Sequence, residues 1–232
     1  RIHEMSSNSL SEIGSKIREL GDQGLRVIAI AYRELGKHEP DTRSEEIEKQ
    51  LIFLGLVGLQ DPPRPEVLDA VRVAKRAGIR IIMLTGDYGP TAKSVALQVG
   101  IVESQNCQVV RGVDLEKTGD TDVKLLLQKK DVVFARVAPE QKLRIVRLLR
   151  ENGEIVAVTG DGANDAPSLK EADIGVAMGL SGTDVAREAS DIVLLDDSFA
   201  SIVKAVESGR AIFDNIRRFI AYVFAHNWAE LS

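Results

Sequence analysis

The chain has 232 residues, of which 44% are hydrophobic, and a formal net charge of −5. This length and apolar content suffice for one full globular core and part of a second unit. The acidic balance argues against a nucleic-acid partner, because proteins that bind nucleic acid usually present a basic face. A single cysteine cannot form an internal disulfide, and the three histidines lie far apart without metal-ligand spacing. We therefore expect a reducing, cytoplasmic setting for most of the chain, which has no initiator Met and which we expect to begin within a longer protein.

The first 60 residues predict a small mixed unit. Apolar spacing favours a helix over residues 10–20 and strands over residues 25–31 and 51–58. Residues 36–49 are polar and charged, so we expect a loop there. The sequence Asp-Pro-Pro-Arg-Pro follows at residues 61–65, and its prolines fix φ and prevent ordinary ladder pairing. This stiff segment predicts a domain boundary.

Between residues 61 and 197, short apolar runs alternate with amphipathic helical stretches. The expected strands are residues 79–84, 132–134, 155–158, 174–177 and 192–195, and the expected helices are residues 65–77, 90–99, 139–151 and 183–189. Each helix opens near a Pro, Asp or Thr, as helix starts do. Strands this apolar, alternating with helices, predict an α/β fold with a doubly wound parallel sheet that is covered on both faces.

The last segment, residues 198–232, differs from the rest. Apolar positions follow helical spacing from Phe199 onward, and charged side chains occupy the other face. The charges stop after Arg217 and Arg218, because residues 219–229 contain no Asp, Glu, Lys or Arg. This pattern indicates a helix that leaves the cytoplasm and enters a bilayer. Only 14 residues follow Arg218, whereas a full span needs about 20, so we expect the chain to end inside the span; a terminal amphipathic helix docked on the α/β domain is the alternative.

The most informative motif is Thr-Gly-Asp-Gly-Ala-Asn-Asp-Ala-Pro at residues 159–167, directly after an apolar strand. Gly160 and Gly162 are expected to let the backbone turn sharply, which places Asp161 and Asp165 at the carboxyl end of that strand. Hard carboxylate oxygens in this position suit Mg2+ held against a phosphate. The alternative is that the two carboxylates serve only as a turn and a helix cap.

Two further strand ends carry groups that suit phosphate. Residues 81–87 run from an apolar strand into Thr-Gly-Asp, where the hydroxyl of Thr85 and nearby backbone amides could bind phosphate oxygens. Lys142 lies in the first turn of the helix that begins at Pro139, and an ammonium there can neutralise phosphoryl charge; a solvated helix-start lysine is the alternative. A hydroxyl, a lysine and paired carboxylates are what phosphoryl transfer requires, apart from the nucleophile.

In this order, the motifs resemble those of the P-type ATPases, the cation pumps whose phosphorylation domain has the haloacid dehalogenase-like fold. The matching strings extend over nearly the whole chain and are Gly24-Leu25-Arg26-Val27, Asp61-Pro62-Pro63-Arg64, Thr85-Gly86-Asp87, Phe134-Ala135-Arg136-Val137 with Pro139 and Lys142, residues 159–167, and Gly182-Thr183-Asp184-Val185. The resemblance assigns residues 1–60 to the end of a nucleotide-binding domain and residues 61–197 to the phosphorylation domain. It assigns residues 198–232 to a stalk and the beginning of the fifth transmembrane helix of a multi-pass membrane protein.

The resemblance also implies roles for single residues. Asp161 would ligate Mg2+, and Asn164 and Asp165 would complete that site. Thr85 and Lys142 would hold phosphoryl oxygens. The further implied contacts are Gly86 in the phosphate-binding turn, Asp87 toward nucleotide and metal, and Arg26 and Arg136 toward ATP; a solvated strand-end charge is the alternative for Arg26.

The tail suggests a transported ion. Asn227 and Glu230 are three residues apart, so a helix places them on one face, and a carboxylate inside a membrane segment is costly unless it serves an ion or proton path. Their spacing resembles the Asn-x-x-Glu ion-ligand pattern on the fifth membrane helix of calcium and sodium-potassium pumps, and we favour Ca2+. The alternative is that both residues only stabilise helix packing.

The phosphorylated aspartate of the family, in an Asp-Lys-Thr-Gly-Thr motif, does not occur in this sequence. Residues 116–120 and 120–122 imitate nucleophile motifs but follow no apolar strand and come after Thr85 instead of before it, so we interpret residues 116–120 as a surface loop. Without a nucleophile, covalent catalysis has no first step, and we expect this segment alone to be inactive. A soluble phosphatase of the same superfamily, or a truncated module that binds nucleotide or a pump partner without catalysis, are the other functions that the sequence allows.

Overall fold

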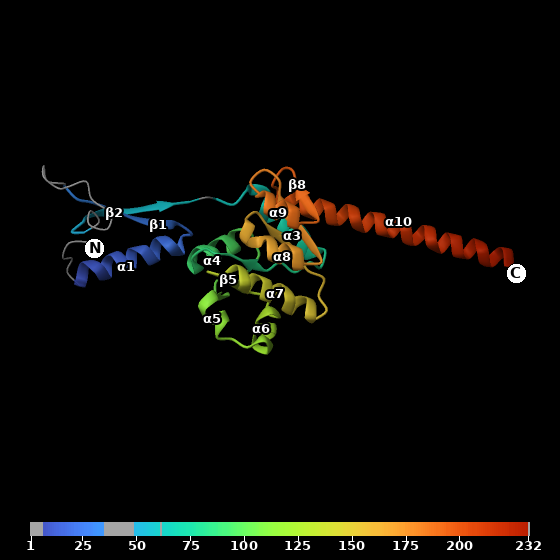
Figure 1. Ribbon diagram of the computed structural model, residues 1–232, viewed down its shortest axis with the longest axis horizontal. Coiled ribbons are helices and arrows are strands. Elements are labelled where there is room, and N and C mark those ends of the chain that lie inside the picture. Colours follow the sequence, from blue (N-terminus) through green and yellow to red (C-terminus); the bar gives the residue numbers. More distant parts are fainter. Residues whose placement is uncertain (1–6, 35–48, 61, 232) are drawn as a thin grey trace.

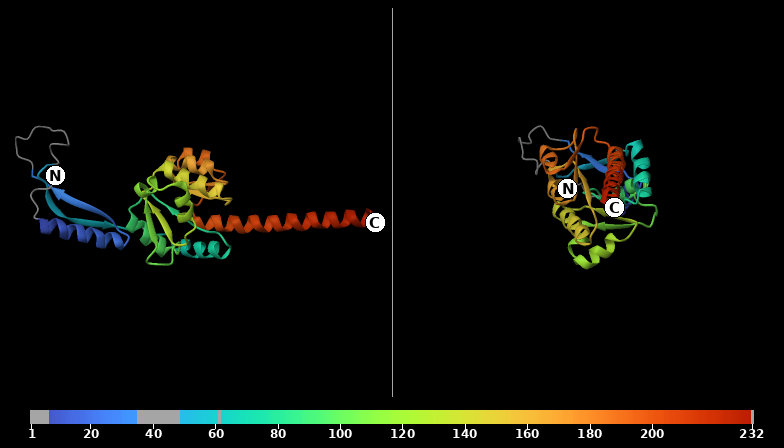
Figure 2. Two further views of the ribbon diagram at one scale, coloured as in Figure 1. Left: turned by 90° about the horizontal axis from the view of Figure 1, so that it is seen from below. Right: turned by 90° about the vertical axis from the view of Figure 1, so that its right-hand side faces the viewer.

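The computed structural model describes residues 7–34, 49–60 and 62–231, without the side chains of residues 7, 8 and 227–231. The molecule is elongated, with a helix and hairpin at one end, an α/β body in the centre and a long helix that projects from the opposite side (Figure 1, Figure 2). The helices and strands are α1 (Ser7–Asp22), β1 (Arg26–Tyr32), β2 (Ile52–Leu59), α3 (Pro65–Arg76), β3 (Met83–Leu84), α4 (Gly89–Gln98), β4 (Gln108–Arg111), α5 (Gly112–Glu116), α6 (Asp120–Leu127), β5 (Val132–Ala135), α7 (Pro139–Glu151), β6 (Ala157–Gly160), the 3-10 turn η1 (Ala163–Asp165), α8 (Ala166–Glu171), β7 (Ile174–Met178), α9 (Asp184–Ala189), β8 (Ile192–Leu194) and α10 (Phe199–Leu231).

The N-terminal unit is an antiparallel hairpin with one helix packed on it. Strands β1 and β2 pair with Arg26 opposite Leu59, and the register shifts between Ile30 and Ala31. Gly24 joins α1 to β1 with a φ of +83°, a left-handed conformation that glycine adopts without steric cost. The predicted helix and two strands are confirmed in this unit. The loop predicted at residues 36–49 lies almost entirely outside the described residues, as does Asp61 of the predicted boundary.

The first parallel sheet has the strand order β3-β5-β4, and its central strand is buried on both faces. Side chains alternate along a strand, so Val132 and Phe134 enter the core formed with α6 and α7, while Val133 and Ala135 pack against α4. This double burial explains why residues 132–134 form a continuous apolar run. The main core of the molecule therefore centres on Phe134, which is 0% exposed.

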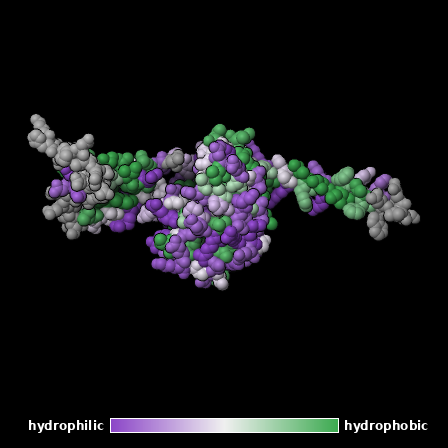
Figure 3. Space-filling model, in the orientation of Figure 1, coloured by the Kyte–Doolittle hydropathy of each residue, from purple (hydrophilic) through white to green (hydrophobic). Residues whose placement is uncertain are grey.

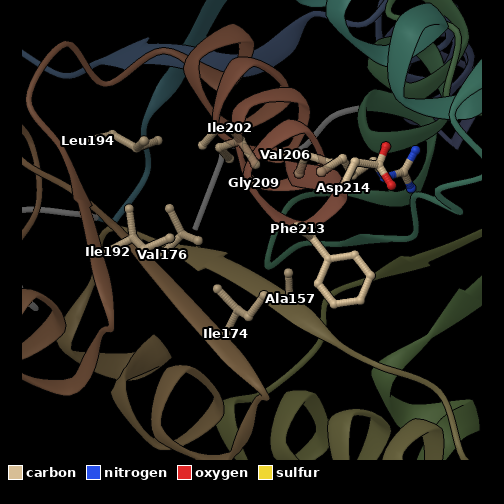
Figure 4. Close-up of a pocket in the computed structure, with 12 residues that line it drawn as sticks. Ala157, Ile174, Val176, Ile192, Leu194, Ile202, Val206, Gly209, Phe213 and Asp214 are labelled. Atoms are coloured by element: carbon tan, nitrogen blue, oxygen red, sulfur yellow. The ribbon is translucent and has the colours of Figure 1, made fainter. Parts of the chain in front are cut away.

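The second parallel sheet has the strand order β6-β7-β8. On one face, Ala177 packs against Leu169 of α8 and Ala186 of α9. On the other face, Val176 and Leu194 look toward α10 across an apolar cavity of about 550 Å³ (Figure 4). Helix α10 also lies along α3, so the base of the long helix is packed against the body while its far end projects away (Figure 2).

The predicted α/β architecture with parallel strands and intervening helices is confirmed, but its strands form two three-stranded sheets instead of one continuous sheet. Among the described residues, β3 pairs only with β5, and β6 pairs only with β7. The expected strand 79–84 shortens to its last two residues, because only these meet β5. Strand β4 and the short helices α5 and α6 were not predicted, and the interpretation of residues 116–120 as a loop is wrong at both ends, since Glu116 closes α5 and Asp120 opens α6.

The predicted C-terminal helix is present as α10 and runs over 33 residues. Within the part of the chain that the structure describes, no helix combines the length and the apolar content needed to cross a bilayer.

We predict that Phe134→Ala lowers the free energy of unfolding by about 3–5 kcal/mol, because it leaves a cavity in the main core. The matched control is Leu125→Ala on α6, whose side chain is 56% exposed, and which should cost about 0.5 kcal/mol or less. Urea denaturation of the 232-residue chain followed by circular dichroism measures both. Equal losses for the two variants would contradict the location of the core.

Candidate functional site

The turn that follows β6 carries the predicted carboxylates. The chain leaves β6 at Gly160, passes through η1 and enters α8 at Ala166. Neither Gly160 nor Gly162 has a positive φ, and Gly162 has an extended φ of −97°, so this turn does not use the left-handed conformations that glycine adopts most easily. Glycine is required at 160 for a steric reason instead, because a Cβ there would lie 2.5 Å from the Cβ of Asp165. The turn is therefore folded tightly onto the Asp165 side chain.

Asp165 is held by a lysine from another helix. The ammonium Nζ of Lys142, in the first turn of α7, donates to Oδ1 of Asp165 at 2.7 Å. The two side chains are only 21% and 13% exposed, so the ion pair is largely shielded from water. The backbone amide of Gly162 donates to the other carboxylate oxygen at 3.3 Å. Two sequence-predicted site residues, Lys142 and Asp165, are thus brought into direct contact.

The turn after β3, which contains Thr85 and Asp87, is hydrogen-bonded to the segment that leads into α7. The Thr85 hydroxyl donates to the Asp87 carboxylate at 3.0 Å and accepts from the Asp87 amide at 3.1 Å. Backbone hydrogen bonds join this turn to the end of β5, where the Val137 amide donates to the Thr85 carbonyl at 3.0 Å and the Arg136 amide to the Asp87 carbonyl at 3.1 Å. One segment, residues 134–142, therefore places both the Thr85 turn and Lys142.

Arg136 occupies an unusual backbone conformation in that segment. Its φ is +53°, in the left-handed region that non-glycine residues rarely adopt. The neighbouring glycine accommodates it, because a Cβ on Gly112 would lie 2.2 Å from the Arg136 carbonyl oxygen. Strained backbone of this kind concentrates at functional sites, where the surrounding structure enforces it.

Of the remaining predicted residues, some share these two turns and others lie elsewhere. Asp161 and Asn164 are exposed on the turn after β6, and Gly86 and Asp87 are exposed on the turn after β3. Arg26 is exposed at the start of β1, within the N-terminal unit. Asn227 and Glu230 belong to α10, but their side chains lie outside the described residues.

The donor set fits Mg2+ only together with a further oxygen ligand. Among the described residues, no three His, Cys, Asp or Glu side chains gather in a way that could hold a metal. Asp161 offers an exposed carboxylate, whereas Asp165 shares its charge with Lys142. Mg2+ commonly binds through one or two carboxylates, several waters and a phosphate. The two carboxylates suit such a site, with a phosphate as the missing partner.

The loop between β7 and α9 contacts the turn that carries Asp161. No role was predicted for this loop from the sequence. Residues 179–183 connect β7 to α9, and the Thr183 amide donates to the Asp161 carbonyl at 2.8 Å. The Thr183 hydroxyl also caps α9 by accepting from the Ala186 amide. The two glycines of the loop were visible in the sequence, but a backbone-to-backbone contact with Asp161 has no sequence pattern of its own.

The apolar cavity between α10 and the second sheet is separate from these groups. Residues from β6, β7, β8 and α10 line it, including Ile174, Ile202 and Phe213, together with the charged residues Arg210 and Asp214 (Figure 4). None of the candidate site residues lines this cavity.

Comparison with known proteins identifies the family of the chain. A family model described as haloacid dehalogenase-like hydrolase matches residues 12–173. The chain is 45% identical over 231 residues to a calcium-transporting ATPase 1 of Bacillus cereus, with 100% of the chain and 26% of the relative covered. It is 46% identical over 227 residues to a calcium-transporting ATPase of Bacillus subtilis, with 97% of the chain and 25% of the relative covered. It is also 42% identical over 258 residues to the potassium-transporting ATPase alpha chain 2 of Cavia porcellus, covering 98% of the chain and 25% of that relative. The chain thus spans about a quarter of the length of these relatives.

We predict that Gly160→Ala lowers the free energy of unfolding by about 1–3 kcal/mol, because the added methyl must displace Asp165 and disturb its ion pair. Gly162→Ala is the matched control, since the nearest atom to its Cβ would be 3.6 Å away. Urea denaturation compares the two variants. A loss for Gly162→Ala as large as that for Gly160→Ala would show that the turn is not packed in this way.

A second prediction concerns Ser168 on α8, whose hydroxyl is buried without a hydrogen-bond partner among the described residues. Removing such a hydroxyl relieves a desolvation cost, so Ser168→Ala should leave the free energy of unfolding unchanged or raise it by up to about 1 kcal/mol. Thr183→Ala, which removes the cap of α9, should instead cost about 0.5–2 kcal/mol. Thermal denaturation of both variants is the measurement, and a clear destabilisation by Ser168→Ala would reveal a partner for this hydroxyl.

Proposed function

Because the chain belongs to the haloacid dehalogenase-like hydrolases and is a segment of a P-type ATPase, we propose that it supplies the phosphorylation domain of a pump that hydrolyses ATP through an aspartyl-phosphate. The carrying observation is the Lys142–Asp165 ion pair beside the exposed carboxylate of Asp161. In this proposal, residues 1–60 complete a nucleotide-binding domain, residues 61–197 form the phosphorylation domain, and residues 198–232 form a stalk and the start of a membrane helix. The intact protein would be a multi-pass membrane protein, with most of this segment in its cytoplasmic head.

The described side chains suggest how the site would act. Lys142 is partly exposed and already oriented by Asp165, so its ammonium can bind a phosphoryl oxygen without a large loss of side-chain entropy. The Thr85 hydroxyl and neighbouring amides would bind further phosphoryl oxygens, and Asp161 with Asp165 and Asn164 would hold Mg2+. When bound, Mg2+ would neutralise the charge that develops on the transferred phosphoryl group. Arg26, Arg136 and Asp87 would contact ATP.

The nucleophile would come from another part of the longer protein. Strands β3 and β6 each pair with only one neighbour among the described strands, and both lead into turns with site residues. Leu84 of β3 and Val158 of β6 pack against the same core. We propose that a further parallel strand with the phosphorylated aspartate pairs with these edges, which would also unite the two sheets. This arrangement explains why the segment alone lacks a nucleophile and is expected to be inactive.

Exposed apolar surface supports packing against more protein or a bilayer. The outer hairpin residue Leu54 is 63% exposed and Phe219 of α10 is 66% exposed. Figure 3 shows hydrophobic surface gathered on the N-terminal unit and along the projecting part of α10. Contiguous apolar surface of this kind marks interaction sites in natural proteins.

We propose Ca2+ as the transported cation. The support is the calcium-transporting function named for two relatives, together with the three-residue spacing of Asn227 and Glu230 on α10. Asn and Glu both carry side-chain oxygen atoms, which suit a hard cation.

Asp161→Asn in the full-length protein is predicted to abolish formation of the phosphoenzyme from radiolabelled ATP, because one Mg2+ ligand loses its charge. ATP binding measured by fluorescence should remain, which shows that the variant folds. Asp122→Asn on α6 is the matched control and should label normally. Normal labelling of Asp161→Asn would refute the proposed metal site.

Glu230→Gln in the full-length protein is predicted to reduce Ca2+-dependent phosphorylation while leaving nucleotide affinity unchanged, since Glu230 would act only on the transported ion. Glu207→Gln, a substitution of an exposed carboxylate on the same helix, is the control. Titration of phosphoenzyme against Ca2+ measures the effect. An unchanged Ca2+ dependence would show that Glu230 does not bind the transported ion and would favour a role in helix packing.

A further inference from the structure

The loop at residues 179–183 is packed too closely for ordinary side chains at its glycines. A Cβ on Gly182 would lie 1.9 Å from the Met178 carbonyl oxygen. A Cβ on Gly179 would lie 2.7 Å from the Leu194 carbonyl oxygen, which also accepts the Gly179 amide at 2.9 Å. The loop is therefore folded against the carboxyl ends of β7 and β8.

Two charged side chains form hydrogen bonds with the backbone of the loop. The Asp197 carboxylate accepts the amide of Leu180 at 2.9 Å and that of Ser181 at 2.7 Å. Arg187 of α9 donates to the carbonyls of Gly179 and Gly182. One residue thus satisfies amides of the loop and the other satisfies its carbonyls. Hydrogen bonds to charged groups are stronger than those between neutral groups, so both side chains restrain the loop backbone. We call the contact between the Asp197 carboxylate and the amides of Leu180 and Ser181 the clamp.

The backbone conformation and the pKa of Asp197 both reflect this contact. Its φ is +51°, so its backbone accepts a left-handed conformation that an L-residue rarely adopts. The hydrogen bond from the Leu180 amide, joined by those from Ser181, holds the pKa of Asp197 at about 2, below its ordinary value. Because the pKa is lowered by folding, the stabilisation is present above the unfolded pKa of about 4 and is lost only as the pH falls toward 2. The clamp is therefore charged throughout the neutral range.

The loop connects the Asp197 contact to the turn after β6 that carries Asp161. Its last residue, Thr183, donates its amide to the carbonyl of Asp161 at 2.8 Å. On the other side, Asp197 stands two residues before Phe199, the first residue of α10. The Asp197 carboxylate, the loop backbone and the Thr183–Asp161 hydrogen bond therefore connect the base of the long helix to the candidate Mg2+ ligand.

We infer that Asp197 is a positioning residue that ties the 179–183 loop, and through it the backbone of Asp161, to the base of α10. This inference rests on the proposed role of Asp161 in binding Mg2+. Asp197 itself touches neither metal nor phosphate in this role. It sets the position of the Asp161 carboxylate relative to the phosphoryl site. Loss of the Asp197 carboxylate should therefore lower the apparent affinity for Mg2+ without changing the affinity for nucleotide.

The discriminating variant is Asp197→Asn in the full-length protein. Asn also tolerates a left-handed backbone, so the substitution removes the charge and one acceptor with little other change. The matched control is Asp196→Asn, because the adjacent Asp196 carboxylate accepts from Ser198 and Ser201 at the start of α10 instead of from the loop. Asp197→Gly separates the two features of the residue, since it removes the carboxylate and relieves the backbone strain.

Hydrogen–deuterium exchange gives the readout that does not depend on activity. In Asp197→Asn and Asp197→Gly, the amides of residues 179–183 should exchange about tenfold faster, as expected when a charge-assisted hydrogen bond is lost. Asp196→Asn should leave these amides protected. Wild-type protection of residues 179–183 in Asp197→Asn would overturn the clamp.

Titration of phosphoenzyme against Mg2+ tests the consequence. Asp197→Asn should raise the Mg2+ concentration for half-maximal phosphorylation at least about threefold, with the ATP affinity unchanged and with Asp196→Asn close to wild type. If Asp161→Asn abolishes labelling while Asp197→Asn keeps the wild-type Mg2+ dependence, the positioning role is refuted and the proposed function stands. If Asp161→Asn labels normally, the proposed metal site itself fails, and with it the meaning of the clamp for catalysis.

Discussion

The ion pair between Lys142 and Asp165 joins the two halves of the α/β body. Lys142 opens α7, which packs on the first sheet, and Asp165 stands at the start of α8, which packs on the second. No strand pairing joins the two sheets among the described residues, so their relative position depends on packing in the shared core, on this contact and on the more exposed ion pairs of Arg147 and Arg150 with Glu171. A largely shielded pair of this kind is costly to break, because either partner alone would remain as an uncompensated charge. The same contact therefore serves the fold and places two groups of the candidate site.

The parallel arrangement of strands explains why some contacts within the candidate site could be expected from the sequence. In a parallel sheet all carboxyl ends meet at one edge, so polar turns that follow apolar runs are brought to the same side of the molecule. Residues 132–134 and 174–177 are apolar because their strands are buried, and both were identified without the structure. The turns with Thr85 and Asp165 follow strands in the same way, and their partners were found at the ends of neighbouring elements.

Other features could not be read from the sequence, for physical reasons. Strand β4 has four residues, of which two are apolar, and helices α5 and α6 are too short to show a clear period. The division into two sheets depends on which strands pair with each other. The apolar content of a strand does not indicate which other strand it pairs with. Gly160 is needed for its contact with Asp165 and not for its backbone angles. Asp197 lies in an acidic pair before a helix, a pattern that indicates a cap, whereas its carboxylate binds the amides of a distant loop.

Helix α10 is the element whose base contacts the most distant parts of the chain. It lies along α3, covers the open face of the second sheet, and starts two residues after the clamp on the 179–183 loop. The cavity beneath it is lined almost wholly by apolar side chains, so few directional contacts fix the helix against that face. The charged and backbone hydrogen bonds at its first turn supply the fixed point instead. The base of α10 is thus connected, through the Asp197 carboxylate and the 179–183 loop, to the backbone of Asp161.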